Sequence, residues 1–347
     1  MNERIRGVLA PVVTPFKPDL SPDPERLIGH CKWLLSQKCG LAVFGTNSEA
    51  NSMSAEERMT LLDALVGAGV DPARMMPGTG CCSISETVEL TAHAVKHGCA
   101  GVLMLPPFYY KNISEEGLYR YFSEVVQRVG DPRLKIYLYH IPPVAVVGIT
   151  PKLVERLLQA YPTAIAGMKD SSGDWNNTKT FLDAFAETAR PAPTARAAST
   201  FDVFVGSESF LLANMRNGGV GTISATANVN PAAIHELYAD YNRQNCSGVC
   251  VKRRANRKAL GTSASTTDLT TLQARLNVVR EVFARKSWPS MIAALKQAIA
   301  IYGNDPEWAR VRPPLVELTT EQARKLAAEL EKIEFSINLV ERCRRSE

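Results

Sequence analysis

Two apolar runs decide the fold of this chain: LKIYLY at residues 134–139 and AIAGMK at residues 164–169. Between them, residues 151–159 carry apolar side chains at helical spacing. A run that is apolar over most of its length suits a strand buried on both faces, and a helix between two such runs is the signature of a parallel sheet. The stretch therefore predicts one strand-helix-strand unit.

The same pattern recurs through most of the chain. The apolar runs are residues 7–14, 41–45, 74–78, 101–105, 134–139, 164–169, 202–206 and 219–224. Segments with helical periodicity lie at residues 24–38, 54–66, 83–97, 114–128, 151–159 and 176–187. Eight strands within residues 1–243 predict an α/β fold, a (β/α)8 TIM barrel. The alternative, an open doubly wound sheet, usually has five or six strands and an early Gly-x-Gly-x-x-Gly turn, which is missing after the first run.

The chain is 347 residues long, about 100 more than one barrel requires. Residues 244–271 are rich in Ser, Thr, Lys and Arg without apolar periodicity, so we expect a basic insertion or loop there. Helical patterning resumes at Leu272, and residues 272–347 are expected to form a C-terminal helical region. The additional length therefore does not predict a second catalytic domain.

The net charge of +5 comes from one place. The run KRRANRK at residues 252–258 contributes five positive charges and no negative ones, so the remainder of the chain sums to zero. A nucleic-acid-binding protein spreads basic residues along a surface or a helix. The charge pattern thus excludes nucleic acid as the expected partner, and no apolar run approaches the roughly 20 residues of a membrane-spanning helix.

The cysteines and the N-terminus indicate a cytoplasmic protein. Eight cysteines are scattered without a Cys-x-x-Cys pair, and the first residues contain charges and prolines instead of the apolar segment of a signal peptide. The spacing of Cys246 and Cys250 is a weak signal for zinc, because no second Cys or His pair lies near them. No cluster of His, Asp and Glu has convincing metal-ligand spacing, so we expect no metal.

In a TIM barrel, catalytic residues lie at the carboxyl ends of the strands. Lys169 ends an apolar run, which would place its amine inside the barrel mouth. Burial disfavours the charged form of an amine and leaves it nucleophilic, as Schiff-base chemistry requires. The alternative is a structural lysine paired with Asp170. Tyr139 ends the preceding run, where its phenol could exchange protons with such an amine or simply pack.

With these residues in view, five ordered motifs identify a resemblance. They are GTNSE at residues 45–49, Tyr109-Tyr110 followed by EGLY at 116–119, YHIP at 139–142, GMKD at 167–170, and GTIS at 221–224 followed by TAN at 226–228. The sequence resembles the dihydrodipicolinate synthase and N-acetylneuraminate lyase family of pyruvate-dependent class I aldolases. The resemblance extends from about Gly7 to the C-terminal helices.

The resemblance implies a reaction between a 2-oxo acid, such as pyruvate, and an aldehyde, with no cofactor other than the imine formed through Lys169. It implies that Tyr139 moves protons, and that Thr46 and its neighbours Gly45 and Asn47 bind the carboxylate of the substrate.

Two further implications concern Ile223 and Tyr110. Ile223 belongs to the motif of the last strand and is expected at the substrate site. Tyr110 is expected to complete the proton relay in a neighbouring subunit, which implies a homodimer or a homotetramer. The alternative for Tyr109 and Tyr110 is simple packing in an interface.

Three departures from the family pattern bear on the substrate. Asn47 stands where the synthases usually have Thr, and it resembles the branch that cleaves deoxy-keto sugar acids or hydroxy-oxo acids. Ser48 replaces the usual Gly. Val144 stands where the synthases carry an Arg that holds the carboxylate of the aldehyde, so a charge-assisted contact is lost. We therefore expect a related aldolase in preference to dihydrodipicolinate synthase itself. A non-catalytic barrel that binds a 2-oxo acid is the alternative from another class.

Other polar residues follow the strands and leave more than one interpretation open. His140 would either contact the substrate or support a neighbouring residue. Glu208 would line the mouth or cap a helix. Asp170, Ser171 and Asp174 are candidates for binding sugar hydroxyls.

Overall fold

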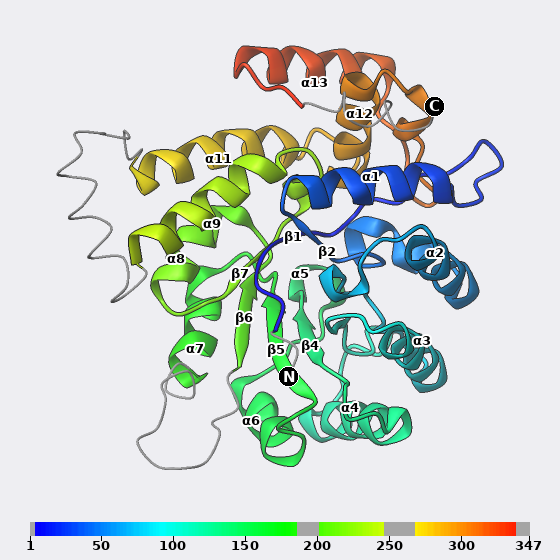
Figure 1. Cartoon of the computed structure of the whole chain (residues 1–347), viewed down its shortest axis with the longest axis vertical. Coiled ribbons are helices and arrows are strands. Elements are labelled where there is room, and N and C mark those ends of the chain that lie inside the picture. Colours follow the sequence, from blue (N-terminus) through cyan, green and yellow to red (C-terminus); the bar gives the residue numbers. More distant parts are fainter. Residues whose placement is uncertain (1–3, 186–200, 246–267, 338–347) are drawn as a thin grey trace.

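The computed structural model describes residues 4–185, 201–245 and 268–337. Its centre is a curled parallel sheet surrounded by helices (Figure 1), and the predicted TIM barrel is confirmed. The sheet order is β2-β1-β7-β6-β5-β4-β3. The strands are β1 (Gly7–Ala10), β2 (Gly40–Leu41), β3 (Val102–Met104), β4 (Ile136–His140), β5 (Ile165–Asp170), β6 (Asp202–Val205) and β7 (Gly221–Ile223).

The run predicted at residues 74–78 closes the ring between β2 and β3, although it forms isolated bridges instead of a regular strand. Met75 pairs with Leu41 on one side, and Gly78 pairs with Leu103 on the other. Pro77 lies between the two bridges and has no N–H to donate, so the ladder is interrupted there. Its carbonyl still accepts the amide of Leu103 at 2.8 Å. Eight segments therefore complete the barrel.

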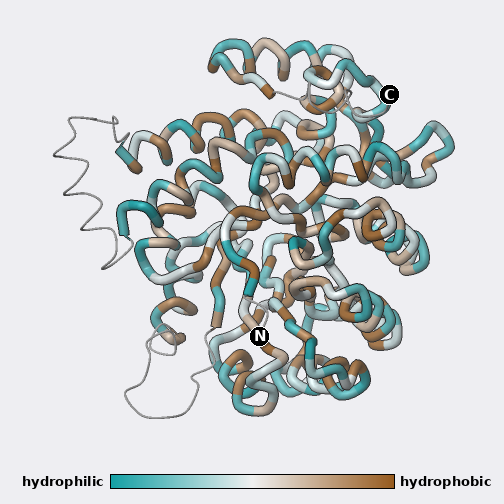
Figure 2. The backbone as a smooth tube through the Cα atoms, viewed as in Figure 1, coloured by the Kyte–Doolittle hydropathy of each residue, from teal (hydrophilic) through white to brown (hydrophobic). Residues whose placement is uncertain are grey.

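Six outer helices follow the predicted segments to within a few residues. They are α1 (Pro24–Ser36), α2 (Ala55–Gly67), α3 (Ile84–Lys96), α4 (Glu115–Val129), α6 (Pro151–Ala160) and α7 (Trp175–Phe185). Two more, α8 (Leu211–Arg216) and α9 (Pro231–Asn245), lie outside those segments. N-caps set the start points: the Ser54 hydroxyl accepts the amide of Glu57, whose carboxylate accepts the amide of Ser54. Hydrophobic and hydrophilic residues alternate along these helices (Figure 2), as expected when one side is buried.

Two apolar cores result from this arrangement. The larger one lies between the sheet and the helices, and the smaller one fills the inside of the barrel. Members of the inner core are Leu9, Ala42, Met76, Leu103, Tyr137, Phe204 and Ile223. Because side chains fill the barrel, access to any reactive group must come from the mouth.

The C-terminal helices are α11 (Leu269–Phe283), α12 (Met291–Gly303) and α13 (Thr320–Lys332), and they lie along one side of the barrel (Figure 1). α9 continues to Asn245 and α11 begins at Leu269, so both ends of the expected insertion at 244–271 are helical. The basic run lies outside the described residues. Within the ranges that the structure describes, no helix combines the length and the apolar character needed to cross a membrane.

Candidate active site

Lys169 and Tyr139 lie side by side because β4 and β5 pair in parallel, with Tyr139 opposite Lys169 in the register. The Lys169 Nζ donates a hydrogen bond to the Tyr139 Oη at 3.2 Å. Both residues are buried, with 2% and 3% of their surfaces exposed. A buried amine within hydrogen-bond reach of a phenol is an arrangement suited to imine chemistry, which needs a nucleophile and a proton carrier.

Asp170 is not the partner of Lys169, because successive side chains of a strand point to opposite faces. The Asp170 carboxylate instead accepts hydrogen bonds from the amide of Ser172 at 2.9 Å and from the side chains of Asn177 and Thr178. The interpretation of Lys169 as a structural lysine paired with Asp170 therefore fails. These contacts also occupy the carboxylate that was a candidate for binding sugar hydroxyls.

Thr46 extends the polar chain from Tyr139. The Tyr139 hydroxyl donates to the Thr46 Oγ1 at 3.3 Å, so amine, phenol and threonine hydroxyl form one continuous path. Thr46 begins a short 3-10 turn, η1 (Thr46–Ser48), directly after Gly45. The first amides of such a turn, those of Thr46 and Asn47, have no acceptor inside it, and this leaves donors for an anionic group.

Ser48 fits the loop without strain. Its backbone is not in the left-handed region; the residues of this loop with positive φ are Phe44 at 59° and Glu49 at 58°. The Ser48 hydroxyl accepts the amide of Gly45 at 3.2 Å, and the Ser48 carbonyl accepts the hydroxyl of Thr14 at 2.7 Å. The replacement of the usual Gly by Ser48 is therefore compatible with this loop conformation.

A buried ion pair anchors the same loop to the C-terminal helices. The Lys296 Nζ, on α12, lies 2.7 Å from the Glu49 Oε1, and neither side chain is exposed. The other Glu49 oxygen accepts the amide of Arg312 at 2.8 Å, and Lys296 also donates to the carbonyl of Thr14 at 2.8 Å. Burial lowers the pKa of Lys296 to about 8. The C-terminal region thus holds the loop that carries Thr46.

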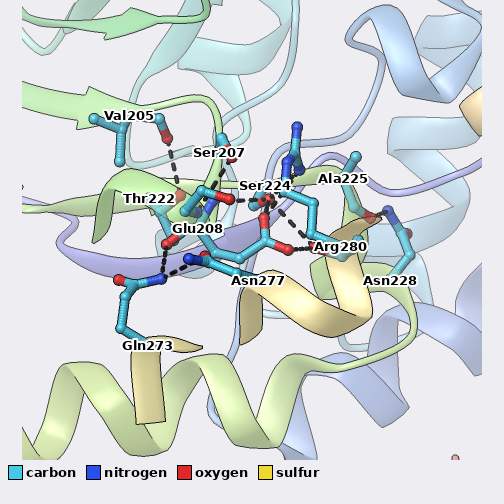
Figure 3. A network of polar contacts seen from close by, with 12 residues as sticks. Val205, Ser207, Glu208, Thr222, Ser224, Ala225, Asn228, Gln273, Asn277 and Arg280 are labelled. Atoms are coloured by element: carbon cyan, nitrogen blue, oxygen red, sulfur yellow. Dashed lines mark hydrogen bonds and ion pairs between the residues drawn. The ribbon is translucent and has the colours of Figure 1, made fainter. Parts of the chain in front are cut away.

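A second polar network lies at the ends of β6 and β7 (Figure 3). Glu208 is buried, and its two carboxylate oxygens contact the hydroxyls of Ser224 and Thr226. Arg280 reaches from α11 to the Glu208 Oε2 at 3.0 Å, and Gln273 of the same helix donates to the Glu208 carbonyl at 2.9 Å. Glu208 therefore does not line the mouth as a free group; it attaches α11 to the segment after β7.

His140 supports the chain after β4. Its Nδ1 accepts the amide of Ile149 at 2.9 Å, and its ring lies against that of Phe181. Burial lowers the pKa of His140, although the nearby Asp170 opposes the shift. A buried, neutral imidazole that accepts a backbone amide favours the supporting role for His140 over substrate contact.

Tyr110 is separated from this chain of groups. Its side chain is 74% exposed and packs edge-on against that of Tyr109, with ring centroids 5.3 Å apart. Val144 lies in the short helix α5 (Pro142–Ala145) and is 60% exposed. The Nζ of Lys111 contacts the carbonyl of Ala145 at 3.4 Å, which brings the loop of the two tyrosines beside α5.

A narrow pocket leads from Tyr139 along the loop after β2. Its lining residues are Phe44, Gly45, Thr46, Ala50, Asn51, Arg58, Gly78, Gly80, Leu103, Leu105 and Tyr139. Arg58 places a cation at this pocket, where its Nη2 contacts the Cys81 sulfur at 2.9 Å. Asn47 is partly exposed, and Ile223 is fully buried at the end of β7.

Sequence reasoning did not single out Lys296, Arg280 or Arg58. Lys296 is the only charged residue of the mostly apolar helix α12, and an isolated charge in such a pattern is the signal that could have found it. Arg280 and Arg58 lie in segments with ordinary amphipathic patterning and carry no comparable signal.

Comparison with known proteins gives consistent matches. A sequence model of the dihydrodipicolinate synthetase family matches residues 4–255. An uncharacterized DapA-like lyase of Chloroflexus aurantiacus is 30% identical over 331 residues, 94% of this chain and 97% of that protein. A 4-hydroxy-tetrahydrodipicolinate synthase of Thermus thermophilus is 35% identical over 231 residues, 66% of this chain and 71% of the relative. The crystal structure of dihydrodipicolinate synthase from Agrobacterium tumefaciens, 27% identical, superposes with a TM-score of 0.76 over 95% of this chain and 99% of that one.

Proposed function

The chain belongs to the dihydrodipicolinate synthetase family, whose members are lyases, and on that premise we propose that Lys169 forms an imine with pyruvate or another 2-oxo acid. The observation that carries the proposal is the buried contact of 3.2 Å between the Lys169 Nζ and the Tyr139 Oη. The reaction then needs no separate cofactor, because the imine through Lys169 supplies the chemistry.

The steps follow from the chain of polar groups. The Lys169 amine attacks the carbonyl carbon of the 2-oxo acid, and the resulting carbinolamine loses water to give a protonated imine. Tyr139 carries the protons of these steps and passes them to the Thr46 hydroxyl, 3.3 Å away. The cationic imine withdraws electrons from the adjacent carbon. In the cleavage direction it accepts the electron pair of the breaking carbon-carbon bond, and in the condensation direction the derived enamine attacks the aldehyde.

We infer that the carboxylate of the 2-oxo acid binds at the loop after β2. The Thr46 hydroxyl and the amides of Thr46 and Asn47 supply donors, and Gly45 leaves room beside them. Ile223 contributes an apolar wall at the end of β7. The anchoring of Glu49 by Lys296 supports this assignment, because a fixed loop keeps its donors aimed at one place.

The proposed substrate is a deoxy-keto sugar acid or a hydroxy-oxo acid, whose cleavage releases the aldehyde. Val144 supports this choice, because α5 offers an exposed apolar side chain where the synthases have a cation. Dihydrodipicolinate synthase activity, with pyruvate and aspartate semialdehyde, is the second candidate. It is supported by the similarity of this chain to the 4-hydroxy-tetrahydrodipicolinate synthase of Thermus thermophilus.

We further propose a homodimer or a homotetramer in which Tyr110 completes the proton relay of a neighbouring subunit. The exposure of Tyr109 and Tyr110 on a loop beside the mouth supports an intersubunit role. We also propose a cytoplasmic location. The five cysteines that the structure describes carry free thiols, and free thiols are typical of a reducing compartment.

Borohydride trapping tests the imine directly. The full chain is incubated with pyruvate and borohydride, and the modified peptide is identified by mass spectrometry. We expect a pyruvyl adduct on Lys169 in the wild type and none there in Lys169→Ala, while Lys111→Ala, which removes an exposed amine from the tyrosine loop, keeps the adduct. Failure to form the adduct in the wild type would contradict the mechanism.

The substrate is tested separately. Retro-aldol cleavage of deoxy-keto sugar acids is compared with condensation of pyruvate and aspartate semialdehyde. Efficient use of the semialdehyde would reject the interpretation of Val144 without affecting that of Lys169. A wild-type adduct with no turnover of either substrate class would instead support the non-catalytic barrel that binds a 2-oxo acid.

A further inference from the structure

Three metal-ligating side chains meet on the outside of the barrel, between α2 and α3. His93 lies in the last turn of α3 and His97 is the C-cap residue of that helix, four positions later, so the two side chains lie on the same side of the helix. Asp63 comes from α2, the neighbouring helix (Figure 1). The Asp63 Oδ1 lies 2.8 Å from the Nε2 of His93 and 2.7 Å from the Nε2 of His97.

The donor atoms lie close enough together to contact one ion. One ligand atom from each of the three residues lies within 4.8 Å of the others. In a tetrahedral zinc site with bonds of about 2.0–2.1 Å, neighbouring ligand atoms are about 3.3 Å apart. The two contacts to Asp63 must therefore lengthen by about half an ångström to admit an ion. Asp63 can make that movement, because 55% of its side chain is exposed.

The hydrogen bonding of His93 favours a ligand over a simple imidazole-carboxylate contact. The Nε2 of His93 is buried and has no hydrogen-bond partner among the described residues, although Asp63 is only 2.8 Å away. The N–H is thus poorly aimed at the carboxylate. A metal ion bound to the lone pair of this nitrogen would satisfy an atom whose only polar contact in the described part of the chain is otherwise the ion pair with Asp63.

We propose that Asp63, His93 and His97 bind one divalent transition-metal ion of the zinc class. Two imidazoles and one carboxylate are ligands that such ions prefer, and Ca²⁺ or Mg²⁺ would select oxygen donors instead. The partial exposure of the three side chains leaves a fourth position for water.

The site is separate from the proposed catalytic centre. His97 follows the last turn of α3 and lies five residues before β3, so it is near the amino ends of the strands. Lys169 lies near the carboxyl end of β5, at the opposite rim. The ion therefore takes no part in imine chemistry. Its effect is to link α2 to α3 across the barrel surface and to stabilise the folded state.

The test measures binding of Zn²⁺ alone to the full, untagged chain after removal of metal with a chelator. Isothermal titration calorimetry should report one Zn²⁺ per chain. Asp63→Asn, His93→Ala and His97→Ala should each weaken the affinity at least about tenfold. His235→Ala, at a histidine on α9 outside the cluster, is the matched control and should leave the affinity unchanged. Asp63→Asn preserves side-chain shape, so its effect does not depend on misfolding.

Two further measurements distinguish binding of the ion at the cluster of Asp63, His93 and His97 from binding at a cysteine thiol. Cys82 is an exposed thiol and could bind Zn²⁺ on its own. Co²⁺ substitution distinguishes the two, because a thiolate ligand produces an intense charge-transfer absorption that imidazole and carboxylate ligands do not. Addition of Zn²⁺ should raise the Tm of the wild type and of Cys82→Ser, and should not raise that of His97→Ala. Absence of uptake, or uptake that survives the loss of His97, would overturn the proposal.

Discussion

Replacement of Lys296 by Met tests whether the C-terminal helices hold the substrate loop. The substitution keeps an unbranched side chain in α12 but removes the ammonium group that lies 2.7 Å from the Glu49 Oε1. It also removes the hydrogen bond to the carbonyl of Thr14 and the contact of the Lys296 Nζ with the Phe16 ring, 4.6 Å from its centroid.

The magnitude follows from burial. Neither side chain of the pair is exposed, and loss of one partner of a buried ion pair typically costs about 3–5 kcal/mol because the other charge is left unpaired. Glu49 keeps the amide of Arg312 at 2.8 Å, so we expect a loss near the lower end, about 3 kcal/mol in the free energy of unfolding. The double variant Lys296→Met with Glu49→Gln should lose less than the sum of the single variants, by about 1–3 kcal/mol.

The assay is urea denaturation at pH 7, followed by tryptophan fluorescence, together with the KM for pyruvate. Because Glu49 directly follows the loop that carries Thr46, both single variants should raise the KM as well as lower stability. Lys332→Met, which removes an exposed lysine from α13, is the matched control. Losses below about 1 kcal/mol, or single effects that add without coupling, would refute the idea that this pair fixes the loop.

Three further predictions concern the mouth and its support. Tyr139→Phe should lower the kcat of the proposed aldolase reaction about 10²–10⁴-fold, because it removes the proton carrier, and it should change the Tm little. An unchanged kcat would exclude Tyr139 from proton transfer. Val144→Arg should raise kcat/KM for aspartate semialdehyde at least about tenfold by restoring a charge-assisted contact, measured in a coupled condensation assay; no gain would show that α5 does not face the aldehyde. Since burial lowers the pKa of His140 below 6.5, the unfolded chain binds a proton there more readily than the folded one, so stability should fall as the pH drops below about 6.5. Tm measured at pH 7.5 and 5.5 should show a smaller fall in His140→Asn, and an equal fall would assign the effect to other groups.

The amino-acid sequence by itself determined the strands, most helices and the candidate imine site. The runs that form β4 and β5 are apolar because both faces of these strands are buried, and Tyr139 and Lys169 stand where those runs end. In a parallel sheet, neighbouring strands end at the same rim, so the proximity of the two residues follows from their positions in the pattern. Local periodicity was sufficient for this part of the molecule.

The tertiary structure alone decided which distant residues meet. The run at residues 74–78, which contains Pro77, forms two isolated bridges instead of a strand, and its partners in them come from the segments of β2 and β3. Lys296 meets Glu49 across 247 positions of sequence, and Asp63 meets His97 across 34. Sequence periodicity records which face of an element is buried, but not which element covers that face. Helix packing and strand register supply that information, and they arise only when the whole chain has folded.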